Sequence, residues 1–323
     1  MIDKVSAIIP AYNNQDTIVD SILSFLDQSH KIYEIVVIDD ASTDSTQSKI
    51  ESIKDKRIKL IKNHNRIGTA NSFNKAFKIT KGDFIVSHGG DDLSIHDRVS
   101  KQLEILNEKK YKVVLSDAFF TNLIGQSISA KPAEFEVPTC CNTVFKRLFW
   151  HGNYLIAPSA IFTRNFFEEN KMFDYSLHLL NDFDLWIKAA INDQIYVMND
   201  KLVKYTRTSA NLGSRGKQKG SLYDYINRIE NEIIYENLFI KLKQHKELNF
   251  EGNHYIKYIN DNKIEDKYTN IINSYLSHRL VEVRIMGLKM LFQQLNTHKI
   301  SLNLDYLNQV KVAVFDQQAK YYV

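Results

Sequence analysis

The chain has 323 residues, of which 44% are hydrophobic and 25% are charged. This composition is ordinary for globular proteins and excludes a disordered or fibrous chain, and the length suffices for two domains. Lys and Arg (42) exceed Asp and Glu (38) by only four residues, which is too small an excess for a dedicated nucleic-acid-binding protein.

The two cysteines, Cys140 and Cys141, are adjacent in the sequence, and neighbouring residues rarely reach disulfide geometry. They predict reduced thiols and therefore a reducing compartment. No stretch of about 18 uninterrupted apolar residues occurs, and the first residues lack a basic segment followed by an apolar one. The sequence therefore predicts a cytoplasmic protein that crosses no membrane.

Between residues 5 and 87 the hydrophobic pattern alternates between strand-like runs and helix-like spacing, as in βαβ units. Short apolar runs predict strands at 5–9, 35–38, 58–61 and 84–86, the first of them ended by Pro10. The intervening segments predict three helices, the first of them capped by Asp16 or Asn14. Continuous apolar runs are typical of parallel strands that are covered on both faces.

Paired aspartates follow two of the predicted strands, at Asp39-Asp40 and at Asp91-Asp92. In open parallel sheets, ligands bind beyond the carboxyl ends of the strands, where loops and helix N-termini converge. Either pair alone is an ordinary turn or cap motif. Two pairs at corresponding strand ends predict a ligand site at this edge of the sheet.

The pattern is less regular from residue 93 onward. It predicts a helix over 98–109, a strand over 113–115 and a helix from Asp182 to Ala189. The glycines and basic residues of 209–220 predict a linker or mobile loop. Beyond it the sequence is helical in pattern, with one apolar stripe formed by Leu222, Ile226, Ile229 and Ile233.

These patterns predict two domains. The first covers residues 1–215 and falls into two parts, over about 1–92 and about 93–215. The second is a helical C-terminal region, 216–323, expected to serve packing, dimerisation or acceptor docking.

Several motifs together carry a family resemblance. They are VSAIIPAYN at 5–13, IVVIDDASTD at 35–44, NRIGTAN at 65–71, GDFI at 82–85, the pair at 91–92, Arg98, and NDFDLW at 181–186. As a set, over about residues 4–212, they resemble family 2 glycosyltransferases of the GT-A fold. The resemblance implies an α/β fold with a mostly parallel, Rossmann-like sheet flanked by helices, followed here by the helical appendage. It also implies inverting sugar transfer from a nucleotide-sugar donor.

The resemblance makes the part over about 1–92 a nucleotide-binding half and the part over about 93–215 an acceptor-binding half. It also assigns a donor site and a metal ligand. The nucleotide-sugar-binding residues that it implies are Pro10, Ala11, Tyr12, Asn13, Asp39, Asp40, Asn65, Gly68, Asn71, Asp91, Asp92 and Arg207. Among them, Asp39 is expected to hydrogen-bond the base, and Asp40 to support the surrounding loop. Asp91 is the expected ligand of Mn²⁺ or Mg²⁺, which would neutralise the leaving diphosphate.

The resemblance also assigns the catalytic base and the acceptor side. Asp182 matches the family's base, which takes the proton of the attacking hydroxyl. Asn153, Tyr154 and Ser159 match the segment that lines the acceptor. The sequence departs from the family pattern at two places, because Gly89 and Asn181 stand where acidic residues are usual. The first departure leaves open how strongly activity depends on the metal.

The favoured interpretation is a transferase that moves a sugar from a UDP-sugar to a hydroxyl of a glycan or lipid-linked acceptor, in bacterial surface polysaccharide synthesis. It would act in the cytoplasm or at the inner face of the membrane, with peripheral membrane contact and homodimerisation left open. The alternative is a catalytically weak sugar-nucleotide-binding or assembly protein, motivated by Gly89 and Asn181. A nucleotidyltransferase is disfavoured because residues 10–14 carry neither glycine nor charge, and a dehydrogenase because no GxGxxG motif follows the first strand.

Overall fold

The structure is a computed structural model that describes residues 3–128, 144–207, 221–244, 275, 283–287 and 289–290. The chain divides into two compact units, Met1–Lys217 and Gln218–Val323. All site residues named above belong to the first unit. Cys140, Cys141 and the predicted loop over 209–220 lie outside the described residues.

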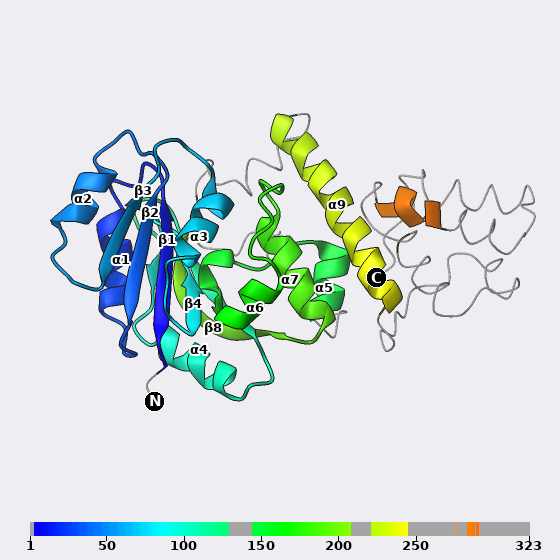
Figure 1. Cartoon of the computed structure of the whole chain (residues 1–323), viewed down its shortest axis with the longest axis horizontal. Coiled ribbons are helices and arrows are strands. Elements are labelled where there is room, and N and C mark those ends of the chain that lie inside the picture. The colour runs from blue at the N-terminus through cyan, green and yellow to red at the C-terminus, as the bar shows by residue number, and fades with distance from the viewer. Residues whose placement is uncertain are drawn as a thin grey trace, which may run out of the picture. The chain divides into compact units, whose positions relative to one another are not determined.

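The first unit is built on an eight-stranded sheet with the order β3-β2-β1-β4-β7-β6-β8-β5 (Figure 1). Its parallel part consists of β1 (Val5–Ala11), β2 (Glu34–Asp39), β3 (Ile58–Lys62) and β4 (Phe84–Ser87). The remaining strands are β5 (Leu93–Ser94), β6 (Val113–Thr121), β7 (Ile161–Thr163) and β8 (Ile195–Thr206). β7 is antiparallel to both β4 and β6, β8 runs parallel to β6, and β5 is antiparallel to β8. The expected α/β fold is confirmed, as a mixed sheet whose N-terminal part is parallel.

Helices cover both faces of this sheet. One face packs against α1 (Ile18–Leu26), α2 (Thr46–Ser52) and α4 (Arg98–Asn107), with Ile22, Phe25 and Leu103 in the shared core. On the other face, Phe73 and Phe77 of α3 (Thr69–Phe77) join an aromatic cluster with side chains that follow β7. The remaining described helices are α5 (Val144–His151), η2 (Ala157–Ser159), α6 (Arg164–Glu169), α7 (Asn181–Ile191) and α9 (Leu222–Gln244). Cover on both faces explains the uninterrupted apolar runs of β1 and β2.

Pro10 does not end β1, contrary to the sequence expectation. The strand continues to Ala11, and Pro10 pairs with Ile38 of β2. In a parallel strand the N–H and C=O of one residue point to the same neighbouring strand. Ile8 points to the β4 side, because its carbonyl accepts the N–H of His88, the residue that follows β4. The nitrogen of Pro10 therefore faces the β4 side, where the pairing has stopped at Ile8 and Ser87. The missing N–H removes no ladder hydrogen bond.

The helix predicted after residue 220 is present as α9, but the predicted stripe is not its buried side. Leu222 and Ile229 are 70% and 40% exposed on α9. The buried side of this helix instead includes Ile234, Tyr235 and Leu238. Along the described parts of the chain, no helix is both long enough and apolar enough to cross a bilayer.

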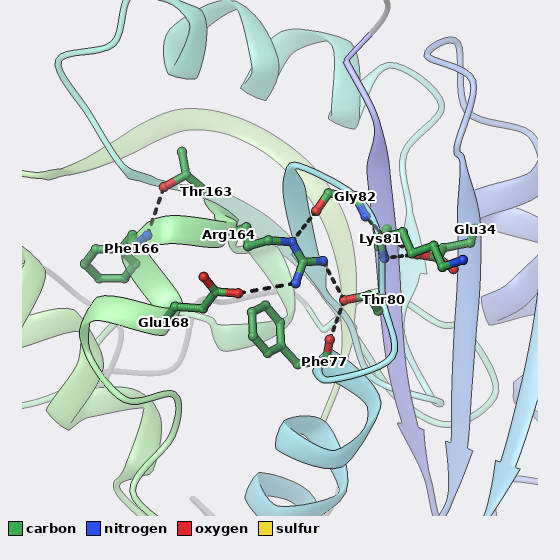
Figure 2. A network of polar contacts seen from close by, with 10 residues as sticks. Glu34, Phe77, Thr80, Lys81, Gly82, Thr163, Arg164, Phe166 and Glu168 are labelled. Atoms are coloured by element: carbon green, nitrogen blue, oxygen red, sulfur yellow. Dashed lines mark hydrogen bonds and ion pairs between the residues drawn. The ribbon is translucent and has the colours of Figure 1, made fainter.

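Arg164 connects the two halves of the first unit by contacts to the residues just before β4 (Figure 2). Its Nε donates to the carbonyl of Gly82 at 2.8 Å, and one terminal nitrogen donates to Thr80 Oγ1 at 2.9 Å. The guanidinium also lies over the Phe77 ring and pairs with Glu168 at 3.6 Å. These contacts attach the start of α6 to the turn that leads from α3 into β4.

Candidate functional site

The loops that follow β1 and β2 are hydrogen-bonded to each other. The Asn13 N–H donates to Ser42 Oγ at 2.9 Å, and the Thr43 N–H donates to Asn13 Oδ1 at 2.9 Å. Asn13 has a left-handed backbone with φ of 53°, which asparagine tolerates better than most residues. The expectation that Asn14 caps α1 with its side chain is wrong, because α1 has no side-chain cap. Asn14 Oδ1 instead accepts the N–H of Tyr12 at 2.8 Å. Hydrogen bonds therefore join the two predicted donor-binding loops.

Asp39 lies at the end of β2 and is fully buried. Its Oδ2 accepts the N–H of Ser42 at 3.1 Å and the side-chain amide of Gln47 at 2.6 Å. Its Oδ1 is buried and accepts no hydrogen bond from any residue that the structure describes. A buried acceptor without a donor is unfavourable by about 1–3 kcal/mol, so this oxygen is suited to an N–H of a ligand.

Arg66 of the loop after β3 contacts Tyr12 of the loop after β1. The guanidinium carbon of Arg66 lies 3.9 Å from the centre of the Tyr12 ring, a cation–π contact. Tyr12 was predicted as part of the donor site, whereas Arg66 was not singled out. The signal was present in the sequence, because Arg66 lies inside the NRIG motif between Asn65 and Gly68.

Asp40 holds the loop that carries Arg66. Its oxygens accept the N–H groups of Ile67 at 2.9 Å and Gly68 at 2.8 Å, as well as the side chains of Asn63 and Ser72. Burial alone would raise the pKa of Asp40, but these hydrogen bonds hold it below its usual value. With both oxygens used inside the protein, Asp40 supports the loop as expected of it and offers little to a ligand.

The loop after β4, residues 88–92, is packed against α1. Ser21 Oγ donates to the carbonyl of Gly89, and Thr17 Oγ1 donates to that of Gly90, both at 2.9 Å. A Cβ atom at Gly89 would lie 2.5 Å from Asp92 Oδ2 and 3.0 Å from Asp91 Oδ1. The absence of a side chain at this position is therefore required by the acidic pair in its present arrangement.

A buried network of polar side chains holds this loop in place. Asp92 is 1% exposed, and its Oδ1 accepts the Thr206 N–H at 2.8 Å. Burial and the charge of Arg98 lower the pKa of His88 to about 3, so this histidine is neutral. Its Nδ1 then accepts from Arg98 at 3.2 Å, and its Nε2–H donates to the carbonyl of Asp92 at 3.0 Å. His88 thus belongs to the support of the acidic pair.

The acidic pair offers one accessible carboxylate. Burial raises the pKa of Asp91 and, together with the charge of Asp91, raises that of Asp92 well above its usual value. Asp91 remains partly exposed, whereas Asp92 is enclosed. Within the described ranges, no three His, Cys, Asp or Glu side chains are grouped closely enough to hold a metal ion. These residues fit a divalent cation that is shared with a bound diphosphate, and do not fit one held by protein ligands alone.

Asp182 lies in the first turn of α7 and is held in place by Asn153. Asn153 Nδ2 donates to Asp182 Oδ2 at 2.8 Å, and the Phe183 N–H donates to Oδ1 at 2.8 Å. Burial raises the pKa of Asp182 to about 6, against the lowering effect of these hydrogen bonds. A carboxylate with such a pKa is ionised at neutral pH and is a stronger base than an ordinary aspartate.

The segment between Asn153 and Ala160 lies against the end of β4. The carbonyl of Ala160 accepts hydrogen bonds from the Ser87 N–H and from the buried Arg98. Ser159, expected to contact the acceptor, is fully buried, and its hydroxyl accepts the Ser116 N–H at 3.1 Å. The same segment thus contacts Arg98, which supports the acidic pair, at one end and Asp182 at the other.

The other predicted residues occupy varied positions. Tyr154 is 8% exposed, and Asn71 donates to the carbonyl of Ile67 at 2.9 Å within the Arg66 loop. Arg207 follows β8 directly after Thr206, and its N–H donates to the carbonyl of Thr121. Its position next to the residue that holds Asp92 places its backbone beside the acidic pair.

A model of the glycosyl transferase family 2 matches residues 6–170, about half of the chain. The chain belongs to this family. The match covers the two donor loops and the acidic pair, whereas Asp182 lies beyond it. Membership makes the protein a glycosyltransferase, as the resemblance implied.

Relatives and solved structures agree with this assignment. A UDP-Glc:α-D-GlcNAc-diphosphoundecaprenol β-1,3-glucosyltransferase of Escherichia coli, WfaP, is 42% identical over 108 residues, which are 33% of this chain and 43% of that protein. TarS 1–349 of S. aureus in complex with UDP-GlcNAc has a TM-score of 0.57 at 19% identity, covering 92% of this chain and 89% of that one. The mannosyltransferase PcManGT of Pyrobaculum calidifontis with GDP-Man and Mn²⁺ has a TM-score of 0.53 at 18% identity, covering 97% and 79%. Both structural likenesses show the GT-A fold.

Proposed function

We propose that this glycosyltransferase moves a sugar from a UDP-sugar to a hydroxyl group of a glycan or lipid-linked acceptor, with inversion at the anomeric carbon. The observation that carries this proposal is the raised pKa of Asp182 together with the hydrogen bond that orients it. Asp182 is a carboxylate with a pKa of about 6, held by Asn153 at the start of a helix, which suits it to take a proton from an attacking hydroxyl.

The donor would bind across the ends of β1, β2 and β4. Asp39 Oδ1 would accept an N–H of the base, with Tyr12 and Arg66 beside it. The diphosphate would then extend toward the acidic pair and Arg207. The dependence of the Escherichia coli relative on UDP-Glc, stated in its name, supports a uridine nucleotide.

Asp91 would hold a divalent cation together with the diphosphate. Such a cation supplies positive charge for the diphosphate as it leaves. Of the two aspartates, Asp91 is the one with exposed surface, and Asp92 together with His88 and Arg98 would keep its loop in place. The Mn²⁺ in the structure of PcManGT supports this role for a metal.

Asp182 would act on the face of the sugar opposite the leaving diphosphate. As the acceptor oxygen bonds to the anomeric carbon, its proton would pass to a carboxylate oxygen of Asp182, and the bond to the diphosphate would break. Asn153 keeps that carboxylate oriented, and attack from the opposite face inverts the configuration.

The acceptor and the setting are proposed by analogy with the Escherichia coli relative, whose name specifies a diphosphoundecaprenol-linked sugar. We place the activity in bacterial surface polysaccharide synthesis, at the cytoplasmic face of the membrane, where a lipid-linked acceptor is met by peripheral contact.

The test is turnover of a panel of nucleotide sugars with and without Mn²⁺, with the anomeric configuration of the product read by NMR. We expect one uridine-linked donor to be consumed with inversion, and turnover to be lost in Asp91→Ala but not in Asp27→Ala, whose side chain is exposed. Binding of nucleotides without turnover of any donor would instead favour the alternative of a sugar-nucleotide-binding protein.

A further inference from the structure

Gln47 is a residue of α2 that contacts Asp39 although it belongs to none of the family motifs used above. Its side-chain nitrogen donates to Asp39 Oδ2 at 2.6 Å, and the Ser42 N–H donates to the same oxygen at 3.1 Å. A carboxylate only accepts hydrogen bonds, so the amide N–H₂ of Gln47 must face it. Because each carboxylate oxygen has about two lone-pair sites, Oδ2 is fully used.

The position of Gln47 is fixed by the residues before it. Thr46, which is fully buried, accepts the Asn14 N–H with its hydroxyl at 2.8 Å and donates to Asp44 at 2.5 Å. Asp44 also accepts the N–H of Gln15 in the first donor loop. The start of α2 is thereby attached to both donor loops, and Gln47 projects from it onto Asp39.

This arrangement leaves one oxygen of Asp39 for a base. Uracil and thymine present a single N–H between two carbonyl groups, which one buried acceptor satisfies. Guanine presents two adjacent donors, an N–H and an amino group, which require both oxygens of a carboxylate. With Oδ2 occupied, guanine would leave one donor buried without a partner, which is unfavourable.

We propose that Gln47 is a positioning residue that selects a uracil-type base over guanine by occupying Asp39 Oδ2. This inference rests on the proposed function, in which Asp39 meets the nucleotide base. The fold by itself does not decide the base, because its solved relatives were captured with UDP-GlcNAc in one case and GDP-Man in the other.

The test is calorimetric titration of the full chain with UDP, TDP and GDP, using the natural protein, Gln47→Leu and Ser48→Ala. Leucine has the size of glutamine but no amide. Ser48 is the next residue of α2 and is exposed, and its hydroxyl donates to the carbonyl of Ser45 within its own turn. We expect the natural protein and Ser48→Ala to bind UDP or TDP at least about tenfold more tightly than GDP. In Gln47→Leu we expect this ratio to fall about tenfold.

The ratio of the affinities for UDP and GDP distinguishes selection of the base from loosening of the loop, because loosening would weaken the binding of all three nucleotides alike. An unchanged ratio in Gln47→Leu, or a natural preference for GDP, overturns the inference and leaves the glycosyltransferase proposal standing. Binding of none of the three nucleotides would overturn the proposed function, and this inference with it.

Asp39→Asn provides a second test that keeps Gln47 in place. The Ser42 N–H and the Gln47 amide are both donors, so they would attract the carbonyl oxygen of the substituted side chain and turn its NH₂ toward the base. That NH₂ opposes the N–H of uracil but matches the acceptor nitrogen of cytosine. We expect UDP binding to weaken at least about tenfold and CDP binding to tighten. An equal loss of affinity for UDP and CDP would show that Gln47 does not fix the orientation of the side chain at position 39, and would overturn the inference.

Discussion

The pKa of Asp182 makes activity dependent on pH at the level of a single residue. Because burial raises this pKa to about 6, the carboxylate is protonated below that pH and cannot accept a proton. We expect kcat/KM to fall about tenfold per pH unit below pH 6. Activity measured between pH 5 and pH 8 at constant ionic strength checks this, and a flat profile down to pH 5 would contradict it.

The same pKa predicts that Asp182 destabilises the fold at neutral pH. The folded-state pKa of about 6 lies above the ordinary value of 3.8, so stability is lost as pH rises from about 4 through 6 and stays lost above that range. Asp182→Asn removes the buried charge and is expected to raise the free energy of unfolding by about 1–3 kcal/mol at pH 7.5. Denaturant unfolding at pH 7.5 and pH 4 measures this gain, which should nearly vanish at the lower pH.

Gly89 predicts that restoring the missing acidic residue will not improve the enzyme. A Cβ at this position would lie 2.5 Å from Asp92 Oδ2, so Gly89→Ala and Gly89→Asp both displace the acidic pair. We expect both variants to lose most donor turnover, with Asp27→Ala, at an exposed side chain, as the control. Turnover of Gly89→Asp above that of the natural protein would mean that the loop readjusts to accept a third carboxylate.

The residues that the sequence did not reveal are those defined by contact. Asp39, Asp91 and Asp182 could be selected because they stand in motifs at strand or helix ends. Gln47 could not, because its role depends on a side chain reaching back from α2 to β2. Ser159 shows the converse, since its motif matches the acceptor segment but its hydroxyl is used by Ser116.

At the scale of elements, Arg164 predicts a structural dependence that is separate from the chemistry. Arg164→Ala removes two hydrogen bonds to the turn at 80–82 and the contact with Phe77, and is expected to lower the free energy of unfolding by about 1–3 kcal/mol. Glu168→Ala removes only a partly exposed ion pair and should lose less than about 1 kcal/mol. Equal losses in the two variants would contradict the assignment.

The elements that sequence patterns predicted best are those with strong local signals. β1, β2 and β4 are buried on both faces and appear as apolar runs, so their positions were predicted within a few residues. β7 has only three residues and owes its existence to pairing with β4 and β6, which no local pattern indicates. The predicted stripe does not mark the buried side of α9, because an apolar residue such as Leu222 need not face a core.

At the scale of the whole molecule, the mixed sheet brings the chemistry-bearing loops into one unit. Parallel pairing of β1, β2 and β4 places Asp39 and Asp91 at one edge, and the return of β8 brings Thr206 onto Asp92. The segment from Asn153 to Ala160 then connects this edge with Asp182. The α/β class was predictable from alternating patterns, whereas the antiparallel return through β7 was not.

The most direct test of the account is donor turnover by Asp182→Asn, compared with Asp193→Asn just beyond the end of the same helix, whose side chain is exposed. The account predicts that Asp182→Asn loses at least about 10²-fold in kcat while its affinity for UDP stays unchanged, and that Asp193→Asn matches the natural protein. Turnover of Asp182→Asn at the natural rate would contradict the role of Asp182 as the base that activates the acceptor.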